Sequence, residues 1–205
     1  LNGRPVRTMG SCLVPPDLLF GRALPRSLPL LRRAKDAGMT MVRLWGGGVI
    51  LPDAFYARAD ELGIMLSQEF PLANCWPETN SVFLGNLETT TRNIVRQVRN
   101  HPAIIEYTGG NEMPWNTLTK HPAWELFQRI VREDDDRLVR ATCPDLGARH
   151  WPWDYSINSS CRHYDETETM RYGEFGTSSP ANLEVWQRTI PPKSQEAAML
   201  ANLRR

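Results

Sequence analysis

The feature that most constrains the fold of this 205-residue chain is a repeated alternation of short apolar runs with longer segments of helical period. Runs of about four to eight strand-like residues that alternate with helices are typical of β/α units around a parallel sheet. The clear runs are PVRTMGSCL, MTMVRLW, GIMLSQEF, AIIEYTGG and RLVRATC, and a weaker one, MRYGEF, follows near residue 172. The sequence therefore predicts an α/β fold.

Apolar residues recur at helical spacing between these runs, and glycine follows two of the resulting helices. Gly38 and Gly63 occupy the position where a C-terminal cap in the left-handed conformation is expected. A third helix must end before His101-Pro102, because a residue that precedes proline is pushed out of the helical region. The expected apolar faces are Leu31-Ala34-Ala37, Phe55-Ala59-Leu62, Leu87-Thr91-Ile94-Val95-Val98 and Trp124-Phe127-Ile130-Val131.

Repeated strand and helix units can close in two main ways, as an open doubly wound sheet or as a barrel. The segment GSCLVPP after the first run lacks the GxGxxG turn that would favour the open sheet. We therefore expect a (β/α)8 TIM barrel. Because a complete barrel has about 250 residues and the pattern weakens after residue 143 of the 205, we expect this barrel to be incomplete or shortened in its second half.

Composition excludes several classes of function. The 24 basic and 23 acidic residues are spread along the chain with a net charge of +1, so a nucleic-acid partner is not expected. No apolar run approaches the roughly 20 residues that span a bilayer, so no membrane partner is expected either. The four cysteines are widely separated and lack histidines at zinc-ligand spacing. We interpret them as ordinary buried thiols rather than as a metal site or a disulfide framework.

Unusual polar residues follow the predicted strands, where a barrel of this type carries its chemistry. Glu112 and Glu174 are carboxylates at the ends of different strands, a pattern typical of glycoside hydrolysis, in which one acid acts on the leaving group and the other on the electrophilic carbon. Apolar surroundings would raise one carboxyl pKa into the range useful for a general acid. The alternative interpretation of either acid is a surface charge or an ion-pair partner. The other residues noted at these ends are Arg43, Trp45, Glu69 and Asn111.

Three motifs in order carry a resemblance to a known family. The segments VRLWGGGVILPDAFYARADELGIMLSQEF, RNHPAIIEYTGGNE and YGEFGTSSP resemble the catalytic barrel of family 2 glycoside hydrolases, in particular the β-mannosidase branch. The opening LNGRPVRTMG resembles the point where that barrel begins after the family's β-sandwich domains. The resemblance implies that residues 1–205 form the glycoside hydrolase barrel domain without those N-terminal domains.

The resemblance also implies roles for individual residues. Glu112, in GGNE, matches the family's acid/base, and Glu174, in YGEFG, matches its nucleophile. Asn111 matches the amide that holds the 2-hydroxyl of the sugar, a contact that should strengthen in the transition state. Arg43 matches a basic residue near the nucleophile, which would keep that carboxylate ionised. A structural ion pair is the alternative role for Arg43.

Several aromatic residues are candidate walls of the sugar subsites. Trp45, in WGGG, matches the mannosidase pattern, and its indole could wall the pocket of the sugar that is cleaved. Trp76 and Trp115 could wall neighbouring subsites, and plain packing is the alternative for all three. His163-Tyr164 could be the aromatic pair that precedes the nucleophile in relatives, with Tyr164 bonded to Glu174.

The function implied is that of a retaining exo-glycosidase that cleaves terminal β-mannosides from an oligosaccharide or glycoside, without metal or organic cofactor. The two carboxyl groups of such an enzyme lie about 5 to 5.5 Å apart. The alternatives are another family 2 activity, namely exo-β-glucosaminidase, β-galactosidase or β-glucuronidase, or a catalytically silent glycan-binding barrel. An unrelated soluble domain is a third. The sequence leaves the natural glycan, the compartment and the oligomeric state open.

Overall fold

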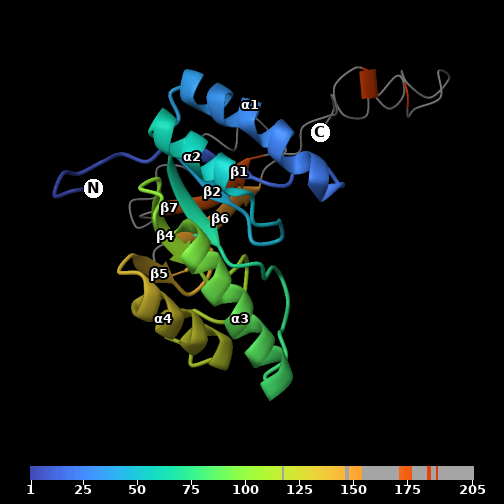
Figure 1. Cartoon of the computed structure of the whole chain (residues 1–205), viewed down its shortest axis with the longest axis vertical. Coiled ribbons are helices and arrows are strands. Elements are labelled where there is room, and N and C mark those ends of the chain that lie inside the picture. The colour runs from blue at the N-terminus through green and yellow to red at the C-terminus, as the bar shows by residue number, and fades with distance from the viewer. Residues whose placement is uncertain (117, 146–147, 154–170, 177–183, 186–187, 189–205) are drawn as a thin grey trace. The chain divides into compact units, whose positions relative to one another are not determined.

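A computed structural model describes residues 1–116, 118–145, 148–153, 171–176, 184–185 and 188 of the chain (Figure 1). The chain divides into two units, Leu1–Ala148 and Arg149–Arg205, and each is described by itself. Among the described residues, none of the helices has the length and apolar character that a membrane span requires.

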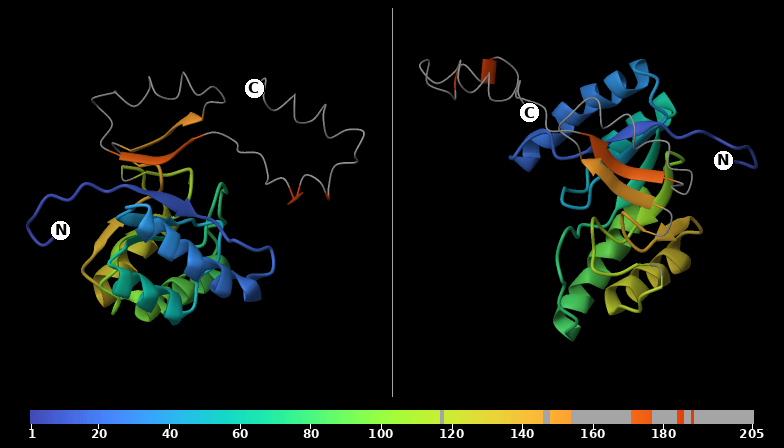
Figure 2. Two further views of the ribbon diagram at one scale, coloured as in Figure 1. Left: turned by 90° about the horizontal axis from the view of Figure 1, so that it is seen from above. Right: turned by 180° about the vertical axis from the view of Figure 1, so that it is seen from behind.

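The first unit contains a five-stranded parallel sheet in the order β1-β2-β3-β4-β5. Its helices connect successive strands and cover one face of the sheet (Figure 2). In chain order the elements are β1 (Gly10–Leu13), the 3-10 turn η1 (Phe20–Arg22), α1 (Ala23–Asp36), β2 (Met41–Leu44), α2 (Asp53–Leu62), β3 (Met65–Glu69), α3 (Ser81–Val98), β4 (Ile104–Thr108), α4 (Pro122–Asp134) and β5 (Leu138–Arg140). The predicted alternation of strands and helices is thus confirmed, and a complete barrel is not shown within the described residues.

The helix ends lie where the sequence signals predicted them. Gly38 and Gly63 follow α1 and α2 with φ angles of +76° and +65°, in the left-handed region that glycine enters without strain. α3 ends at Val98, before His101-Pro102. At its start, the side chain of Asn80 accepts a hydrogen bond from the backbone N–H of Phe83 and so caps the helix.

The hydrophobic core lies between the sheet and its helices. Phe70, directly after β3, stacks on Tyr107 of β4 and on Phe127 of α4, with ring centroids 5.8 and 4.6 Å apart. All three side chains are fully buried. Since burying one such side chain contributes about 1.5 to 3 kcal/mol, this cluster ties α4 to the centre of the sheet.

The opposite face of the sheet is polar and buried. Side chains alternate between the two faces along a strand, and Arg43, Ser67 and Glu106 are neighbours in the register of β2, β3 and β4. The hydroxyl of Ser67 donates to Glu106 Oε1 at 2.7 Å, and Arg140 Nε donates to the other oxygen of Glu106 at 2.9 Å. These contacts satisfy the buried charge of Glu106 at the middle of the sheet.

A two-stranded sheet follows, formed by β6 (Ala148–Trp153) and β7 (Arg171–Gly176), and it belongs to the second unit except for Ala148, the last residue of the first. β7 corresponds to the weak run MRYGEF and confirms it as a strand. β6 was not predicted. Its segment ARHWPW contains Pro152, which cannot donate a ladder hydrogen bond and which masks the strand signal in the sequence.

Candidate active site

The loops that follow the parallel strands of the first unit meet at one edge of the sheet. Isolated bridges pair Ala73 with Asn111 and Asn111 with Cys143, so the segments after β3, β4 and β5 continue side by side beyond the strands. In parallel α/β folds this edge is where catalytic groups gather. The sequence prediction that Asn111 and Glu112 lie at a strand end is therefore confirmed.

Arg43, on β2, is the centre of a buried polar network. Its Nε donates to Glu69 Oε1 at 2.7 Å, its Nη2 donates to Asn111 Oδ1 at 2.6 Å, and its Nη1 lies 3.3 Å from the sulfur of Cys12. Arg43 is 4% exposed. Burial on its own would lower the pKa of Arg43, but the Glu69 carboxylate outweighs this effect and the pKa is raised. Arg43 is therefore a permanent cation.

Glu69, the last residue of β3, is a site residue to which the sequence analysis gave no role. Its second oxygen, Oε2, accepts the backbone N–H of Gly46 at 2.7 Å, so the carboxylate joins the end of β2 to the WGGG turn. The residue is 1% exposed. An acidic residue at the end of a central strand, in register beside a strand that carries an arginine, was the signal that could have identified this pair.

Asn111 connects this network to Glu112 through Asn74. Asn111 Nδ2 donates to Asn74 Oδ1 at 2.9 Å, and Asn74 Nδ2 donates to Glu112 Oε2. A backbone hydrogen bond joins the same two asparagines, since the N–H of Asn74 donates to the carbonyl of Asn111 at 2.9 Å. Asn74 lies in the loop after β3 and was not among the predicted site residues.

The turn after β4 presents the Glu112 carboxylate to solvent. Gly110 has a φ of +125°, and a Cβ there would lie 2.6 Å from the carbonyl oxygen of Leu72. Glu112 has a φ of +46°, which is unusual for a residue other than glycine, and its N–H donates to the carbonyl of Cys143 at 2.7 Å. Glu112 is exposed, whereas Asn111 is 3% exposed. Backbone strain of this kind is concentrated at functional sites.

The three candidate tryptophans of the first unit occupy different environments. Trp45 is half-buried, and a Cβ on Gly47 would lie 2.0 Å from its indole, so the ring lies against the WGGG backbone. Trp115 is 2% exposed, donates its indole N–H to the carbonyl of Ala141 at 2.8 Å and stacks on His121. Trp76 is 81% exposed. Trp115 is thus a packing residue in this unit, while Trp45 and Trp76 have surface available for a ligand.

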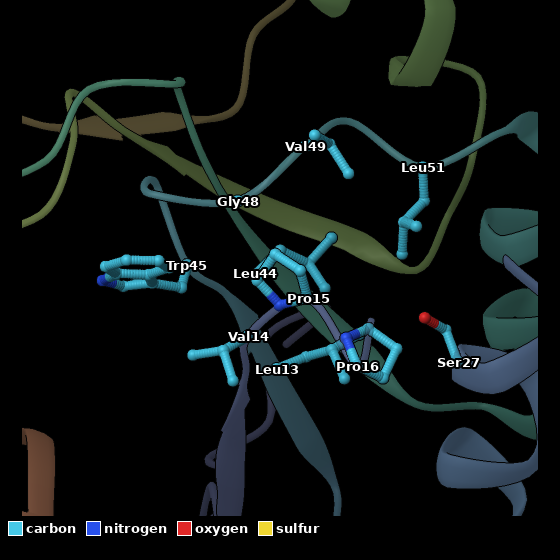
Figure 3. A pocket seen from close by; sticks show the side chains of 10 residues that line it. All are labelled: Leu13, Val14, Pro15, Pro16, Ser27, Leu44, Trp45, Gly48, Val49 and Leu51. Atoms are coloured by element: carbon cyan, nitrogen blue, oxygen red, sulfur yellow. The ribbon is translucent and has the colours of Figure 1, made fainter. Parts of the chain in front are cut away.

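A small apolar pocket lies beside Trp45 (Figure 3). Trp45 stands at one edge, and Ser27 and Leu51 lie at the opposite edge. The hydroxyl of Ser27 already donates to the carbonyl of Ala23 at 2.7 Å. The residues that line the pocket are Leu13, Val14, Pro15, Pro16, Ser27, Leu44, Trp45, Gly48, Val49 and Leu51. The described residues of this lining offer apolar contact, and none of them carries a charge.

In the second unit, Glu174 lies on β7 and faces His150 of β6. His150 Nδ1 is 3.8 Å from Glu174 Oε2, and the Glu174 side chain is 17% exposed. His150 was not predicted as a site residue, because β6 was not recognised as a strand. Tyr164 and His163 lie outside the described residues. Glu112 and Glu174 belong to separate units, so the expected spacing of their carboxyl groups stays a prediction.

The cysteines were interpreted as buried thiols, and this is correct for Cys143 alone among the described ones. Cys12 and Cys75 are half-buried, whereas Cys143 is buried. Cys161 lies outside the described residues. Burial was overestimated because Cys75 lies in the exposed loop that follows β3, although it is among the residues that pack against the core.

Comparisons with known proteins agree on one class of enzyme. The chain is 38% identical to a β-mannosidase of Rattus norvegicus over 113 residues, which cover 55% of this chain and 13% of that protein. It is 35% identical to β-mannosidase A of Emericella nidulans over an alignment of 237 positions that covers 94% of this chain and 25% of the relative. Among solved structures, a β-D-mannosidase from Dictyoglomus thermophilum matches 94% of this chain and 26% of its own, with a TM-score of 0.78 and 27% identity. No family model matches the chain.

The comparisons also bear on the length of the chain. It spans only 13 to 25% of the length of these two relatives. The alignment with the Emericella protein is longer than the 205 residues of this chain, so that relative carries segments without a counterpart here.

Proposed function

We propose that this chain is the catalytic part of a retaining exo-glycosidase of glycoside hydrolase family 2, and that it hydrolyses terminal β-mannosidic bonds. The observation that carries the proposal is the pairing of an exposed Glu112 with a buried Asn111 at the end of β4, where Arg43 holds the amide in place. The similarity to β-mannosidases over 94% of the chain supports the choice of substrate.

The mechanism is a double displacement with retention. Glu174 attacks the anomeric carbon while Glu112 protonates the departing oxygen, which forms a glycosyl-enzyme and releases the alcohol. Glu112 then removes a proton from water, and the water oxygen displaces Glu174 from the sugar. The protons balance over the two steps, and no metal or organic cofactor takes part.

Asn111 is assigned to the hydroxyl group next to the anomeric carbon. Its Oδ1 accepts from Arg43 and its Nδ2 donates to Asn74. An amide group has two acceptor sites and two donor protons, so each atom has one further bond to offer a sugar hydroxyl. Because the guanidinium of Arg43 is bound to Glu69, we assign Arg43 to orienting Asn111 rather than to ionising Glu174.

Trp45 is assigned to the wall of the sugar pocket, and Trp76 to a neighbouring subsite. Both indoles have free surface, and a ring face packs well on the apolar side of a pyranose. We assign Tyr164 to a hydrogen bond with the nucleophile Glu174, and this assignment rests on the family resemblance alone. We assign no subsite role to Trp115, because its indole is buried and donates its N–H to the carbonyl of Ala141.

The alternative functions differ in the sugar that is cleaved or in whether any sugar is cleaved. The test is turnover of p-nitrophenyl β-mannoside, β-glucosaminide, β-galactoside and β-glucuronide by the 205-residue chain. We expect the mannoside to be cleaved with initial release of β-mannose, which proton NMR detects before the sugar mutarotates.

Variants of the two acids connect this activity to the site. Glu174→Gln should lower kcat by more than 1000-fold with p-nitrophenyl β-mannoside, and Glu112→Gln should do so with an alkyl β-mannoside, whose alcohol is a poor leaving group and needs the acid. Glu61→Gln, an exposed acid on α2, is the matched control and should retain full activity. Binding of mannose without turnover of any of the four substrates would instead support the silent glycan-binding barrel, and preferred cleavage of another glycoside would assign that activity.

A further inference from the structure

We infer that Asn74 is a positioning residue for the acid/base carboxylate, which fixes the oxygen of Glu112 that carries the transferable proton and favours the ionised form of the group. The inference deepens the proposed function and rests on it for the role of Glu112. It does not depend on which sugar is cleaved.

The direction of the side-chain hydrogen bonds that lead from Arg43 through Asn111 and Asn74 to Glu112 follows from Arg43. A guanidinium can only donate, so Asn111 Oδ1 must be the atom that accepts from Arg43 at 2.6 Å. Asn111 therefore turns its NH2 group toward Asn74, whose Oδ1 accepts it at 2.9 Å. The NH2 group of Asn74 is then the one that faces Glu112 Oε2. The donor at Glu112 is thus set by a buried cation rather than by an arbitrary choice of amide orientation.

The backbone of Asn74 holds the amide in this position. Asn74 has a φ of +50°, in the left-handed region where asparagine is more common than most residues. Its N–H donates to the carbonyl of Asn111 at 2.9 Å, and Ala73 forms a parallel bridge with Asn111. Main chain and side chain are therefore tied to the same partner.

A donor at Oε2 has two consequences for acid–base catalysis. First, the proton that Glu112 transfers is carried by Oε1, while Oε2 accepts from Asn74 in both the neutral and the ionised state. Second, an N–H donor binds a carboxylate more strongly than a neutral acid, so it favours ionisation. Removal of this donor should move protonation of Glu112 to higher pH. Asn74 and Glu112 both reach solvent, so losing one neutral donor should raise the midpoint of Glu112 protonation by less than the arrival of a second negative charge would.

Two variants test this without adding strain at position 74. Asn74→Asp keeps the shape and the left-handed backbone but replaces the donor with a second negative charge, so its shift should exceed that of Asn74→Gly, which only removes the side chain. Asn80→Ala, in the same loop, is the matched control, because Asn80 caps α3 and its hydrogen bonds go to Phe83 and Glu78. It should lower stability without changing protonation of Glu112.

The first measurement does not require activity. The carboxyl 13C signals of glutamate are followed by NMR as the pH changes, and the Glu112 signal is identified by its loss in Glu112→Gln. We expect the midpoint to rise in Asn74→Gly, to rise further in Asn74→Asp and to stay constant in Asn80→Ala. An unchanged midpoint in both folded Asn74 variants would overturn the inference.

The second measurement is the pH profile of kcat with p-nitrophenyl β-mannoside. The alkaline limb should move to higher pH in both Asn74 variants, and kcat should fall more for an alkyl mannoside, which needs the acid, than for an activated aryl one. A uniform loss of kcat with an unmoved profile would mean a merely structural role and would overturn the inference. If no glycoside is cleaved but the NMR midpoint rises, the proposed function fails while the link between Asn74 and Glu112 stands.

Discussion

The substitution Glu69→Gln tests whether the Arg43 network holds the first unit together. Glu69 accepts from Arg43 Nε at 2.7 Å with one oxygen and from the backbone N–H of Gly46 at 2.7 Å with the other. Glutamine has a single acceptor oxygen. If it faces Arg43, its NH2 group meets the N–H of Gly46, and if it faces Gly46, its NH2 group meets the guanidinium. One donor is left unpaired in either orientation, and the cation loses its counter-charge.

The expected loss follows from the burial of both partners. The side chains of Arg43 and Glu69 are 4% and 0% exposed, so solvent does not screen their interaction. Breaking a buried ion pair by removing one charge typically destabilises a protein by about 3 to 5 kcal/mol. With a urea m-value of about 2 kcal/mol/M, the midpoint of unfolding should fall by roughly 1.5 to 2.5 M.

The assay is urea unfolding followed by far-ultraviolet circular dichroism, which reports on α1 to α4 of the first unit. Glu61→Gln is the control, since the Arg58–Glu61 pair on α2 is solvent-exposed and such pairs contribute about 1 kcal/mol or less. A loss below about 1 kcal/mol for Glu69→Gln, or a loss equal to that of the control, would refute the argument that the buried pair is a structural anchor.

Two further predictions concern backbone conformation and pH. Gly110→Ala should lower the free energy of unfolding in urea by more than about 2 kcal/mol, because the φ of Gly110 is +125° and an added Cβ would lie 2.6 Å from a carbonyl oxygen. Gly85→Ala, at an open position on α3, should raise that free energy by about 0.5 to 1 kcal/mol. Equal effects of the two substitutions would contradict the prediction. Burial alone would lower the pKa of His101, but the carboxylates of Asp60 and Asp53 more than compensate and the pKa is raised. The stability that this interaction contributes is fully present below the pKa of about 6.5 of an unfolded histidine, and it is lost as the pH rises through the pKa of the folded state. The melting temperature of the wild type should therefore fall over that pH window, and that of His101→Gln should not. Parallel plots of melting temperature against pH for the two proteins would contradict this prediction.

The sequence was sufficient for the features that depend on local pattern. The strands β2 to β5, the caps at Gly38 and Gly63 and the position of Asn111 and Glu112 at a strand end all follow from periodicity and turn chemistry. β6 was missed because its proline hides a short strand, which among the described residues pairs with β7.

The rest of the site depends on contacts between residues far apart in the chain. Asn74 lies in the irregular loop PLANCWPETN, and only the fold brings its amide to Glu112. Trp115 follows Glu112 closely and resembled a subsite wall for that reason. The carbonyl of Ala141, which accepts its indole N–H, lies on a segment whose position the sequence pattern did not fix.

The buried Arg43–Glu69 pair is better explained by orientation than by stability. Apolar residues of similar volume often stabilise a protein as well as a buried ion pair does, so stability alone does not account for these charges. Asn111 and Asn74 could each form comparable contacts with the side-chain amide rotated by half a turn. Arg43, fixed by Glu69, cannot accept a hydrogen bond, so it sets the orientation of both amides whether Glu112 is ionised or protonated. Under the proposed function, the charge sets which amide atoms face the sugar and Glu112, so a variant that is as stable but lacks the guanidinium should turn over p-nitrophenyl β-mannoside more slowly than the wild type.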